Sequence, residues 1–436
     1  MKKVTYILIG AGQRGQRYSN HAAEYENMQM VAVAEPNKVV RDYIQKKHDL
    51  PEQMCFDSYE EVLAKEKFAD FAMICTLDRM HMAPALAAIE KGYDLLLEKP
   101  VAPTAEECTA LCEAAEKMGV RVTVCHVLRY APFAKKVKEL LDEGRVGKIM
   151  NVIHSEGVGN LHFSHSYVRG DFRNEAESSN VLLAKSCHDI DLLQWLIGSR
   201  CTKVQSFGQL SHFCAENAPE GAPMRCADGC PHLKTCPYNA FEIYRDRAGI
   251  AGTWRKKAAQ KVTPTYEELT EAINTSAYGR CVYHCDNDVM DHQTVNLQYE
   301  NGVTAVFTVS AFNKGGRRLH IMGTKGELIS TDFCTIELFT YCDEDVNSET
   351  YGLPKREIID TSPEGRDQTI VGGHGGGDSG MVRDIHKLYT FGEESISVSS
   401  VRTSVENHLT VFAAEESRKN GGILVDVDDF IARHKS

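Results

Sequence analysis

The sequence predicts an α/β protein in which a doubly wound parallel sheet is followed by an α+β domain with a largely antiparallel, open-faced sheet. Apolar, strand-like segments alternate with helix-like segments through the first third of the chain, and such alternation is typical of parallel sheets with right-handed crossovers. A glycine-rich turn, Gly10–Gly15, directly follows the first of these strands. Beyond about residue 127 the expected strands alternate polar and apolar residues, as the strands of a sheet with one covered face do.

The parallel sheet is expected from short apolar segments separated by helical ones. Its expected strands are Val4–Ile9, Met30–Ala34, Phe71–Cys75, Tyr93–Leu97 and Val120–Cys125. Two of the intervening helices are expected to begin at capping boxes, because Ser58 and Thr104 are each followed three residues later by a glutamate.

The second part is expected to contain a helix over Asp189–Ile197 and alternating strands over Thr294–Tyr299 and Thr304–Ser310. A chain of 436 residues is long for a single hydrophobic core, so we expect two domains. We place them at residues 1–126 and 127–436, with a cysteine-rich insertion at about residues 211–283 of the second domain.

Composition and charge narrow the possible partners. The net charge of −12 argues against non-specific binding to nucleic acid or to anionic membranes. No apolar run approaches the ~20 residues that span a bilayer. The apolar stretch Val4–Ile9 breaks at once into Gly10, without the cleavage site of a signal peptide behind it. We therefore expect a cytoplasmic protein with no nucleic-acid or membrane partner.

The turn Gly10-Ala11-Gly12-Gln13-Arg14-Gly15 has the G-x-G-x-x-G pattern of a dinucleotide-binding Rossmann domain and lies between a strand and a helix. The first glycine permits a tight turn, the second lets the backbone approach a pyrophosphate, and the third lets helix and strand pack closely. Glu35 ends the second strand, where a carboxylate would accept hydrogen bonds from the adenosine ribose. Because Glu35 would repel a 2′-phosphate, we expect NAD rather than NADP as the cofactor, although Lys38 and Arg41 lie nearby in the sequence.

Further segments carry a resemblance to a known family. Glu98-Lys99-Pro100 follows the strand Tyr93–Leu97, and Thr76 and His81 follow the strand before it. The other segments are Val127–Pro132, Ser186–Asp191 and Asn301-Gly302. Together with the glycine-rich turn they resemble the Gfo/Idh/MocA oxidoreductases, a family that includes glucose–fructose oxidoreductase and inositol dehydrogenase.

The resemblance implies an NAD-dependent dehydrogenase and assigns roles to individual residues. Lys99 would lie beside the nicotinamide and hydrogen-bond the oxygen whose charge changes during hydride transfer, while Pro100 would fix the backbone, with a cis bond as one option. His188 would act as the general base. The implied cofactor-binding residues are Gly10, Ala11, Gly12, Gln13, Arg14, Gly15, Glu35, Thr76, His81, Glu98 and Lys99, and the implied substrate-binding residues are Arg129, Tyr167, Arg169, Asp191 and His374.

The segment before His188 departs from the family pattern. Many members have an acid four residues before this histidine, whereas here Ala184 occupies that position and Lys185 follows it. Lys185 is therefore a candidate catalytic residue beside Lys99 and His188, because its charge could lower the pKa of a neighbour or bind an anionic group of the substrate. A solvated lysine at the edge of a helix is the alternative.

The leading functional hypothesis is hydride transfer between NAD and a hydroxyl-bearing carbon of a sugar, polyol or sugar derivative. The second is an NAD-dependent glycoside hydrolase or lyase that oxidises the sugar transiently and reduces it again. The third is a nucleotide-binding regulator without turnover. The resemblance also implies a homodimer or homotetramer, because a sheet with helices on one face only would expose an apolar patch on the other face.

The cysteine-rich insertion predicts a structural metal site. Cys226, Cys230 and Cys236 lie within eleven residues, and the 15 cysteines of the chain favour free thiols or metal ligands over a disulfide framework. A structural zinc needs a fourth ligand, which we assign to Cys281, although the spacing does not choose between it and Cys285, Cys214 or His232. An iron–sulfur cluster and a set of unliganded thiols are the alternatives.

Overall fold

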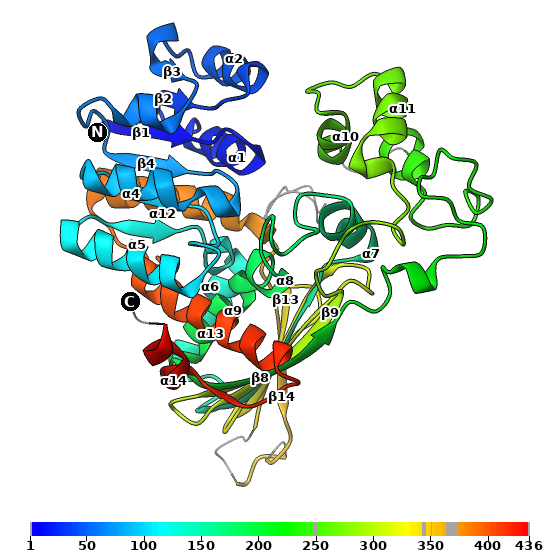
Figure 1. Cartoon of the computed structure of the whole chain (residues 1–436). Coiled ribbons are helices and arrows are strands. Elements are labelled where there is room, and N and C mark those ends of the chain that lie inside the picture. The colour runs from blue at the N-terminus through cyan, green and yellow to red at the C-terminus, as the bar shows by residue number, and fades with distance from the viewer. Residues whose placement is uncertain (1, 248–251, 342–345, 350, 363–373, 435–436) are drawn as a thin grey trace.

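The computed structural model describes residues 2–247, 252–341, 346–349, 351–362 and 374–434, and these form two β-sheets with helices around them (Figure 1). The strands of the first sheet run parallel in the order β3-β2-β1-β4-β5-β6. They are β1 (Val4–Ile9), β2 (Met28–Ala34), β3 (Cys55–Phe56), β4 (Phe71–Ile74), β5 (Asp94–Leu97) and β6 (Val122–Val124). The predicted doubly wound parallel sheet is confirmed, and its strand order reverses at β1, where such sheets bind their ligands.

Helices cover both faces of the first sheet. Alternate residues of β1 enter different hydrophobic cores, Tyr6 and Leu8 on one face and Ile7 and Ile9 on the other, because side chains of a strand alternate in direction. The first face is covered by α1 (Gln13–Ala22), α2 (Lys38–Lys47) and α12 (Gly377–Phe391), and the second by α3 (Tyr59–Leu63), α4 (Met82–Glu90) and α5 (Ala105–Met118). Helix α12 comes from late in the chain, so the residues that cover this sheet extend beyond the range 1–126.

The second sheet has the order β14-β13-β12-β11-β7-β10-β9-β8-β15. All its neighbouring strands are antiparallel except β7 and β10, which confirms the predicted α+β domain with a largely antiparallel sheet. The strands are β7 (Ile149–Gly157), β8 (Cys201–Gln209), β9 (His292–Tyr299), β10 (Thr304–Ser310), β11 (Gly316–Gly323), β12 (Gly326–Ser330), β13 (Thr335–Thr340), β14 (Lys355–Asp360) and β15 (Val425–Asp426).

Two helices, α9 (Cys187–Ile197) and α13 (Val401–Lys419), pack against one face of the second sheet (Figure 1). The remaining helices around it are α6 (Pro132–Asp142), α7 (Asn160–Phe163), α8 (Val181–Ala184) and α14 (Val427–Arg433). None of the helices in the described ranges is both long and apolar enough to cross a bilayer.

The cysteine-rich insertion lies between β8 and β9 and carries α10 (Gly252–Ala259) and α11 (Tyr266–Thr275), which stand apart from both sheets (Figure 1). Its own hydrophobic core is small and consists of Cys226, Ala240, Ile243, Tyr244, Ala258, Ile273 and Tyr278. The insertion packs on the segment that follows β7. There the rings of Trp254 and His165 stack at 4.6 Å, and Lys257 forms an ion pair with Asp171 at 2.5 Å.

Candidate active site

The glycine-rich turn connects β1 to α1, and each glycine has a separate physical reason to be there. Gly10 has a φ of 86°, and a Cβ on it would lie 2.7 Å from the carbonyl carbon of Cys75. A Cβ on Gly15 would lie 2.3 Å from the carbonyl oxygen of Gly10, whereas a Cβ on Gly12 would meet nothing within 4 Å. No side chain caps α1 at Gly12, so the first amides of the helix are available to an anion. The turn therefore fits a pyrophosphate.

Glu35 follows β2 and is held toward this turn. Its carboxylate accepts hydrogen bonds from the backbone amides of Ala11 at 2.8 Å and Asn37 at 2.9 Å. The two nearby cations already have carboxylate partners, because Arg41 pairs with Asp57 and Lys38 pairs with Asp42. Neither cation is therefore free to balance a 2′-phosphate placed beside Glu35.

We expect wild-type protein to bind NAD(H) more tightly than NADP(H), because like charges at Glu35 and the 2′-phosphate repel each other. Glu35→Ser should reduce this preference, and the exposed acid of the same region, Glu52, provides a control as Glu52→Ser. Calorimetric titration with both cofactors measures the ratio. Equal or tighter binding of NADP by the wild type would contradict this expectation, as would an unchanged ratio in Glu35→Ser.

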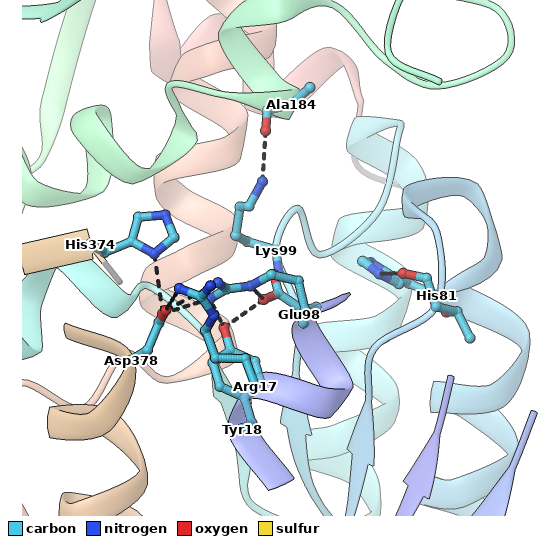
Figure 2. A network of polar contacts seen from close by, with 10 residues as sticks. Arg17, Tyr18, His81, Glu98, Lys99, Ala184, His374 and Asp378 are labelled. Atoms are coloured by element: carbon cyan, nitrogen blue, oxygen red, sulfur yellow. Dashed lines mark hydrogen bonds and ion pairs between the residues drawn. The ribbon is translucent and has the colours of Figure 1, made fainter. Parts of the chain in front are cut away.

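Lys99 projects from the end of β5 toward the second domain (Figure 2). The Lys99–Pro100 peptide bond is cis, as the resemblance allowed. The Lys99 ammonium donates a hydrogen bond to the carbonyl oxygen of Ala184 at 2.6 Å. A main-chain carbonyl thus takes the place of the acid that many family members carry at position 184. An ammonium has three donors, so Lys99 retains hydrogen-bonding capacity for a ligand.

A buried carboxylate positions Lys99. Glu98 accepts hydrogen bonds from the Lys99 backbone amide at 2.8 Å, from Arg14 Nε at 2.8 Å and from the Tyr18 hydroxyl at 2.5 Å (Figure 2). Burial alone would raise the pKa of the Glu98 carboxyl, but the charges of Arg14 and Lys99 lower it overall. Arg14 also pairs with Asp378, which accepts a hydrogen bond from His374 at 3.1 Å. Because Glu98 is 4% exposed, we interpret it as a positioning residue rather than as a direct ligand of the cofactor.

His188 lies near the start of α9 among other histidines. Its ring centroid is 5.6 Å from that of His126 and 5.5 Å from that of His374. Burial lowers the pKa of His188 well below its ordinary value, and the charge of Lys99 lowers it further. The ring is therefore neutral at pH 7 and able to accept a proton. The Lys99 ammonium bonds the carbonyl oxygen of Ala184, four residues before His188 in the sequence.

Lys185 is paired with a buried carboxylate, so the alternative of a solvated lysine at a helix edge does not hold. Its ammonium lies 3.1 Å from Oε1 of Glu156, and Arg317 Nε lies 3.0 Å from Oε2 of the same carboxylate. Arg317 also pairs with Asp189 at 2.7 Å, and Asp189 accepts from His154 at 2.7 Å. Two cations therefore alternate with two buried carboxylates beside Lys99 and His188.

Three of the predicted substrate-binding residues have charges that are paired or hydrogen-bonded within the protein. Asp191 and Arg129 form a buried pair with two hydrogen bonds of 2.7 Å, and Asn407 donates a further one to Asp191 at 2.8 Å. Arg169 is 1% exposed and bonds the carbonyl oxygens of Arg280 and Tyr238 in the insertion. The partners that satisfy these charges lie inside the protein, and contact of Asp191, Arg129 and Arg169 with a substrate stays a prediction.

His81, for which a cofactor contact is predicted, is also held by partners inside the protein. Its ring is fully buried, and its two nitrogens face the carbonyl oxygens of Pro100 at 2.7 Å and Thr76 at 3.1 Å (Figure 2). His81 therefore ties the loop after β4 to the loop after β5. Thr76 itself is half-buried and donates to the carbonyl oxygen of Met80 at 2.9 Å. Tyr167 is 4% exposed and stacks on Phe163 at 5.0 Å; its contact with substrate stays a prediction.

The sequence analysis missed three residues that surround these groups, namely His126, Glu156 and Arg317. His126 follows β6 at the carboxyl edge of the parallel sheet, a position that a search for polar residues at strand ends would have found. Glu156 and Arg317 lie in β7 and β11 and are paired across the sheet. Nothing in the sequence distinguishes a charged residue that is buried by such pairing from an exposed one.

The predicted structural zinc is not supported. Within the described part of the chain, no three His, Cys, Asp or Glu side chains gather in an arrangement that could hold a metal ion. The cysteines described are free thiols, Cys226, Cys230, Cys236 and Cys281 among them.

Comparison with known proteins identifies relatives of the whole chain. Residues 4–126 match an oxidoreductase family with an NAD-binding Rossmann fold, known as Gfo/Idh/MocA, and residues 138–425 match the C-terminal alpha/beta domain of the same family. The oxidoreductase YteT of Bacillus subtilis is 25% identical over 337 residues, which are 76% of this chain and 74% of YteT. The 2,7-anhydro-N-acetylneuraminate hydratase of Mediterraneibacter gnavus is 24% identical over 208 residues, 48% of this chain and 53% of the hydratase.

Among solved structures, levoglucosan dehydrogenase in complex with NADH and L-sorbose has a TM-score of 0.69 at 16% sequence identity. The similarity covers 98% of this chain and 99% of that one. It supports the two-domain fold described above.

Proposed function

Because the chain belongs to the Gfo/Idh/MocA oxidoreductase family, we propose that it transfers a hydride between NAD and a hydroxyl-bearing carbon of a sugar, polyol or sugar derivative. The observation that carries this proposal is the meeting of Lys99, from the nucleotide-binding sheet, with the α8–α9 segment that bears His188. Lys99 follows the carboxyl end of β5, where the resemblance implies that the nicotinamide lies, and it contacts the segment that carries the candidate base.

The chain's own residues have separate tasks in this reaction, for which bound NAD supplies the hydride acceptor. His188 removes the proton of the substrate hydroxyl as the carbon–hydrogen bond breaks. Lys99 donates a hydrogen bond to the oxygen that becomes the carbonyl oxygen. Glu98 keeps the Lys99 backbone in place through its 2.8 Å hydrogen bond. In the reverse direction, the same groups return the proton and stabilise the alkoxide.

The charges around the site favour a neutral, hydroxylated substrate. Lys185 is paired with Glu156, and Arg317 is paired with both Glu156 and Asp189. These cations are therefore neutralised within the protein, which argues against the option that Lys185 binds an anionic group. Paired side chains of this kind still offer hydrogen bonds to hydroxyl groups.

A second candidate function is NAD-dependent cleavage or hydration of a glycosidic or anhydro-sugar bond through transient oxidation. The similarity of the chain to a 2,7-anhydro-N-acetylneuraminate hydratase supports this second candidate. Lys99 and His188 serve either route, because both begin with oxidation of a hydroxyl carbon. Membership of an oxidoreductase family argues against the third hypothesis, a regulator without turnover.

A panel of sugars, inositols, anhydro-sugars and aryl glycosides, assayed with NAD, separates the two routes. Formation of NADH in proportion to product is the result expected for the dehydrogenase. Release of an aglycone or ring-opened product with only catalytic NAD would instead favour transient oxidation. Turnover of the panel without any requirement for NAD would contradict both.

We also propose that the protein is a homodimer or homotetramer that pairs through the uncovered face of the second sheet. Ile153 of β7, Phe207 of β8 and Val306 of β10 are 51%, 53% and 37% exposed there. Their neighbours on that face include Thr294 and Asn296, so the face is more polar than the sequence led us to expect. Mixed faces of this kind are common at protein interfaces.

Light scattering at micromolar concentration is expected to give at least twice the chain mass of 48.6 kDa. Ile153→Glu combined with Val306→Glu should shift the protein toward monomer, since charges at an interface core are disfavoured. Met118→Glu, which replaces an exposed apolar residue on α5 of the other domain, is the control. A wild-type mass equal to one chain would contradict the proposal.

A further inference from the structure

Side chains hold the main chain of the loop that carries Lys99. Lys99, Pro100 and Val101 lie in the loop after β5. The Lys99 amide donates a hydrogen bond to Glu98 at 2.8 Å, and the carbonyl oxygen of Pro100 lies 2.7 Å from Nδ1 of His81. Two consecutive residues of the loop therefore have side-chain partners that belong to the first sheet and its loops.

The third residue of the loop has a partner from a distant part of the chain. The Val101 amide donates a hydrogen bond at 3.1 Å to Nε2 of His408, which lies 307 positions later in the sequence. His408 belongs to α13, and both residues are 0% exposed. Because solvent does not reach this contact, water cannot replace His408 as the acceptor of the Val101 amide.

Helix α13 is anchored to both sheets, and this brings His408 to the loop. Just before the helix, the carbonyl oxygen of Ser399 accepts a hydrogen bond from the Val124 amide of β6 at 2.9 Å. Ser400 then caps the helix by accepting from the Thr403 amide. The helix itself lies between α5 and β8 (Figure 1). The position of His408 is therefore fixed by elements other than the loop that it holds.

The His408 ring is oriented as an acceptor. Its Nδ1 lies 2.6 Å from the carbonyl oxygen of Ser404, one turn earlier in α13. An N–H at Nδ1 donates to that carbonyl, which leaves Nε2 to accept the Val101 amide. Burial, and to a smaller extent the neighbouring His126, lowers the pKa of His408 to about 3. The ring is therefore neutral at pH 7, as this pair of hydrogen bonds requires.

The position of this loop determines where the Lys99 ammonium can lie. The ammonium stands at the end of a flexible four-carbon chain, so its reach is limited by where the main chain of residue 99 is held. Its hydrogen bond to the Ala184 carbonyl at 2.6 Å depends on that position. A charge-stabilising group that is displaced by about 1 Å loses much of its effect on the reaction rate.

We infer that His408 is a positioning residue for Lys99, because it accepts the Val101 amide and so fixes the loop that carries the ammonium. His408 acts through this loop and not by contact with the substrate. Its expected effect on turnover rests on the proposed function. Its hold on the loop does not, and is measured without a substrate.

Hydrogen–deuterium exchange of the full chain, followed by mass spectrometry, tests the hold on the loop. The side chain of His408→Asn is too short to reach the Val101 amide, so exchange in peptides that contain residues 99–102 should become about fivefold faster or more. His408→Gln, whose amide oxygen reaches about as far as Nε2, should keep the wild-type rate. The control is His386→Leu, which removes another buried imidazole, on α12 and 2.8 Å from Asn27, and should leave this exchange unchanged.

Two further measurements report on Lys99 itself. In the wild type, acetic anhydride should acetylate Lys99 more slowly than the exposed Lys91, because the Lys99 ammonium is bonded to Ala184. His408→Asn should bring the two rates closer together, and His408→Gln should not. With a substrate from the panel, His408→Asn should lower kcat about tenfold and retain NAD affinity. This loss is smaller than that of Lys99→Ala, since the ammonium is displaced rather than removed.

Unchanged exchange and unchanged acetylation in His408→Asn would overturn the hold of His408 on the loop. Faster exchange with an unchanged kcat would overturn its positioning role, and so would equal losses in His386→Leu. If the wild type turns over no member of the panel, the proposed function fails, whereas exchange and acetylation still decide whether His408 fixes Lys99. His408→Leu, which fills the place of the ring without an acceptor, takes the place of His408→Asn if that variant does not fold.

Discussion

Lys99→Ala should lower turnover by about 10²-fold or more, because a positioned proton-transfer or charge-stabilising group contributes at least that much. Affinity for NAD should stay near the wild-type value. The Lys99 ammonium bonds Ala184 in the second domain, whereas the glycine-rich turn and Glu35 are built by residues elsewhere on the first sheet. His188→Ala should reduce turnover by a similar factor for the complementary reason, the loss of the base.

Lys91→Ala is the matched control, since Lys91 is an exposed lysine at the end of α4 in the same domain. Steady-state kinetics with the best substrate of the panel give turnover, and calorimetry gives NAD affinity. Near-wild-type turnover in Lys99→Ala would refute the role of Lys99. A fall in turnover that only follows lost NAD binding would assign Lys99 to the cofactor site instead.

Asp191→Ala should destabilise the protein by about 3–5 kcal/mol, which is typical when one partner of a buried ion pair is removed. Asp191 and Arg129 are 0% and 3% exposed and share two hydrogen bonds. Without the carboxylate, the Arg129 charge stays buried and unpaired. Urea denaturation followed by circular dichroism measures the change in free energy of unfolding.

The double variant Arg129→Met with Asp191→Leu should recover much of this loss, because no isolated charge then remains buried. Asp142→Ala, which removes the exposed partner of Lys138, should change stability by less than about 1 kcal/mol. If Asp191→Ala is as stable as Asp142→Ala, the buried pair does not contribute to stability as expected.

The parts of the fold that follow from local pattern were predictable. Strands β1 and β10 have the predicted bounds, Val4–Ile9 and Thr304–Ser310, because apolar runs and alternation report directly on strands. The sequence analysis explained the glycines of the turn by close backbone packing. At Gly10 and Gly15 a Cβ would indeed clash with backbone atoms. The cis peptide before Pro100 was given as an option by the resemblance rather than by any pattern, and the hydrogen bond of Lys99 to Ala184 was not predicted.

The remaining features depend on contacts that a sequence does not encode locally. Asp191 has the spacing of a residue on the face of α9 that bears His188, yet its charge is satisfied by Arg129 from another segment. Glu156 lies in β7 and is far from Lys185 in the sequence, so the two meet only in the folded protein. Cys226 and Cys281 line one cavity only once the whole insertion has folded, so spacing alone could not place Cys281 beside the loop.

The central claim is direct hydride transfer between a hydroxyl-bearing carbon and NAD at the Lys99–His188 site. It is tested most directly by giving the enzyme a substrate deuterated at the oxidised carbon and analysing the cofactor by mass spectrometry after a single turnover. The account predicts that labelled NADH is present at the end of the turnover of the wild type, and that label transfer is strongly slowed in Lys99→Ala. In the transient-oxidation route the nicotinamide carries the label only before the deuteride returns to the product. Formation of an oxidised product with the deuterium lost to solvent, and with none on the nicotinamide at any time in the turnover, would contradict it.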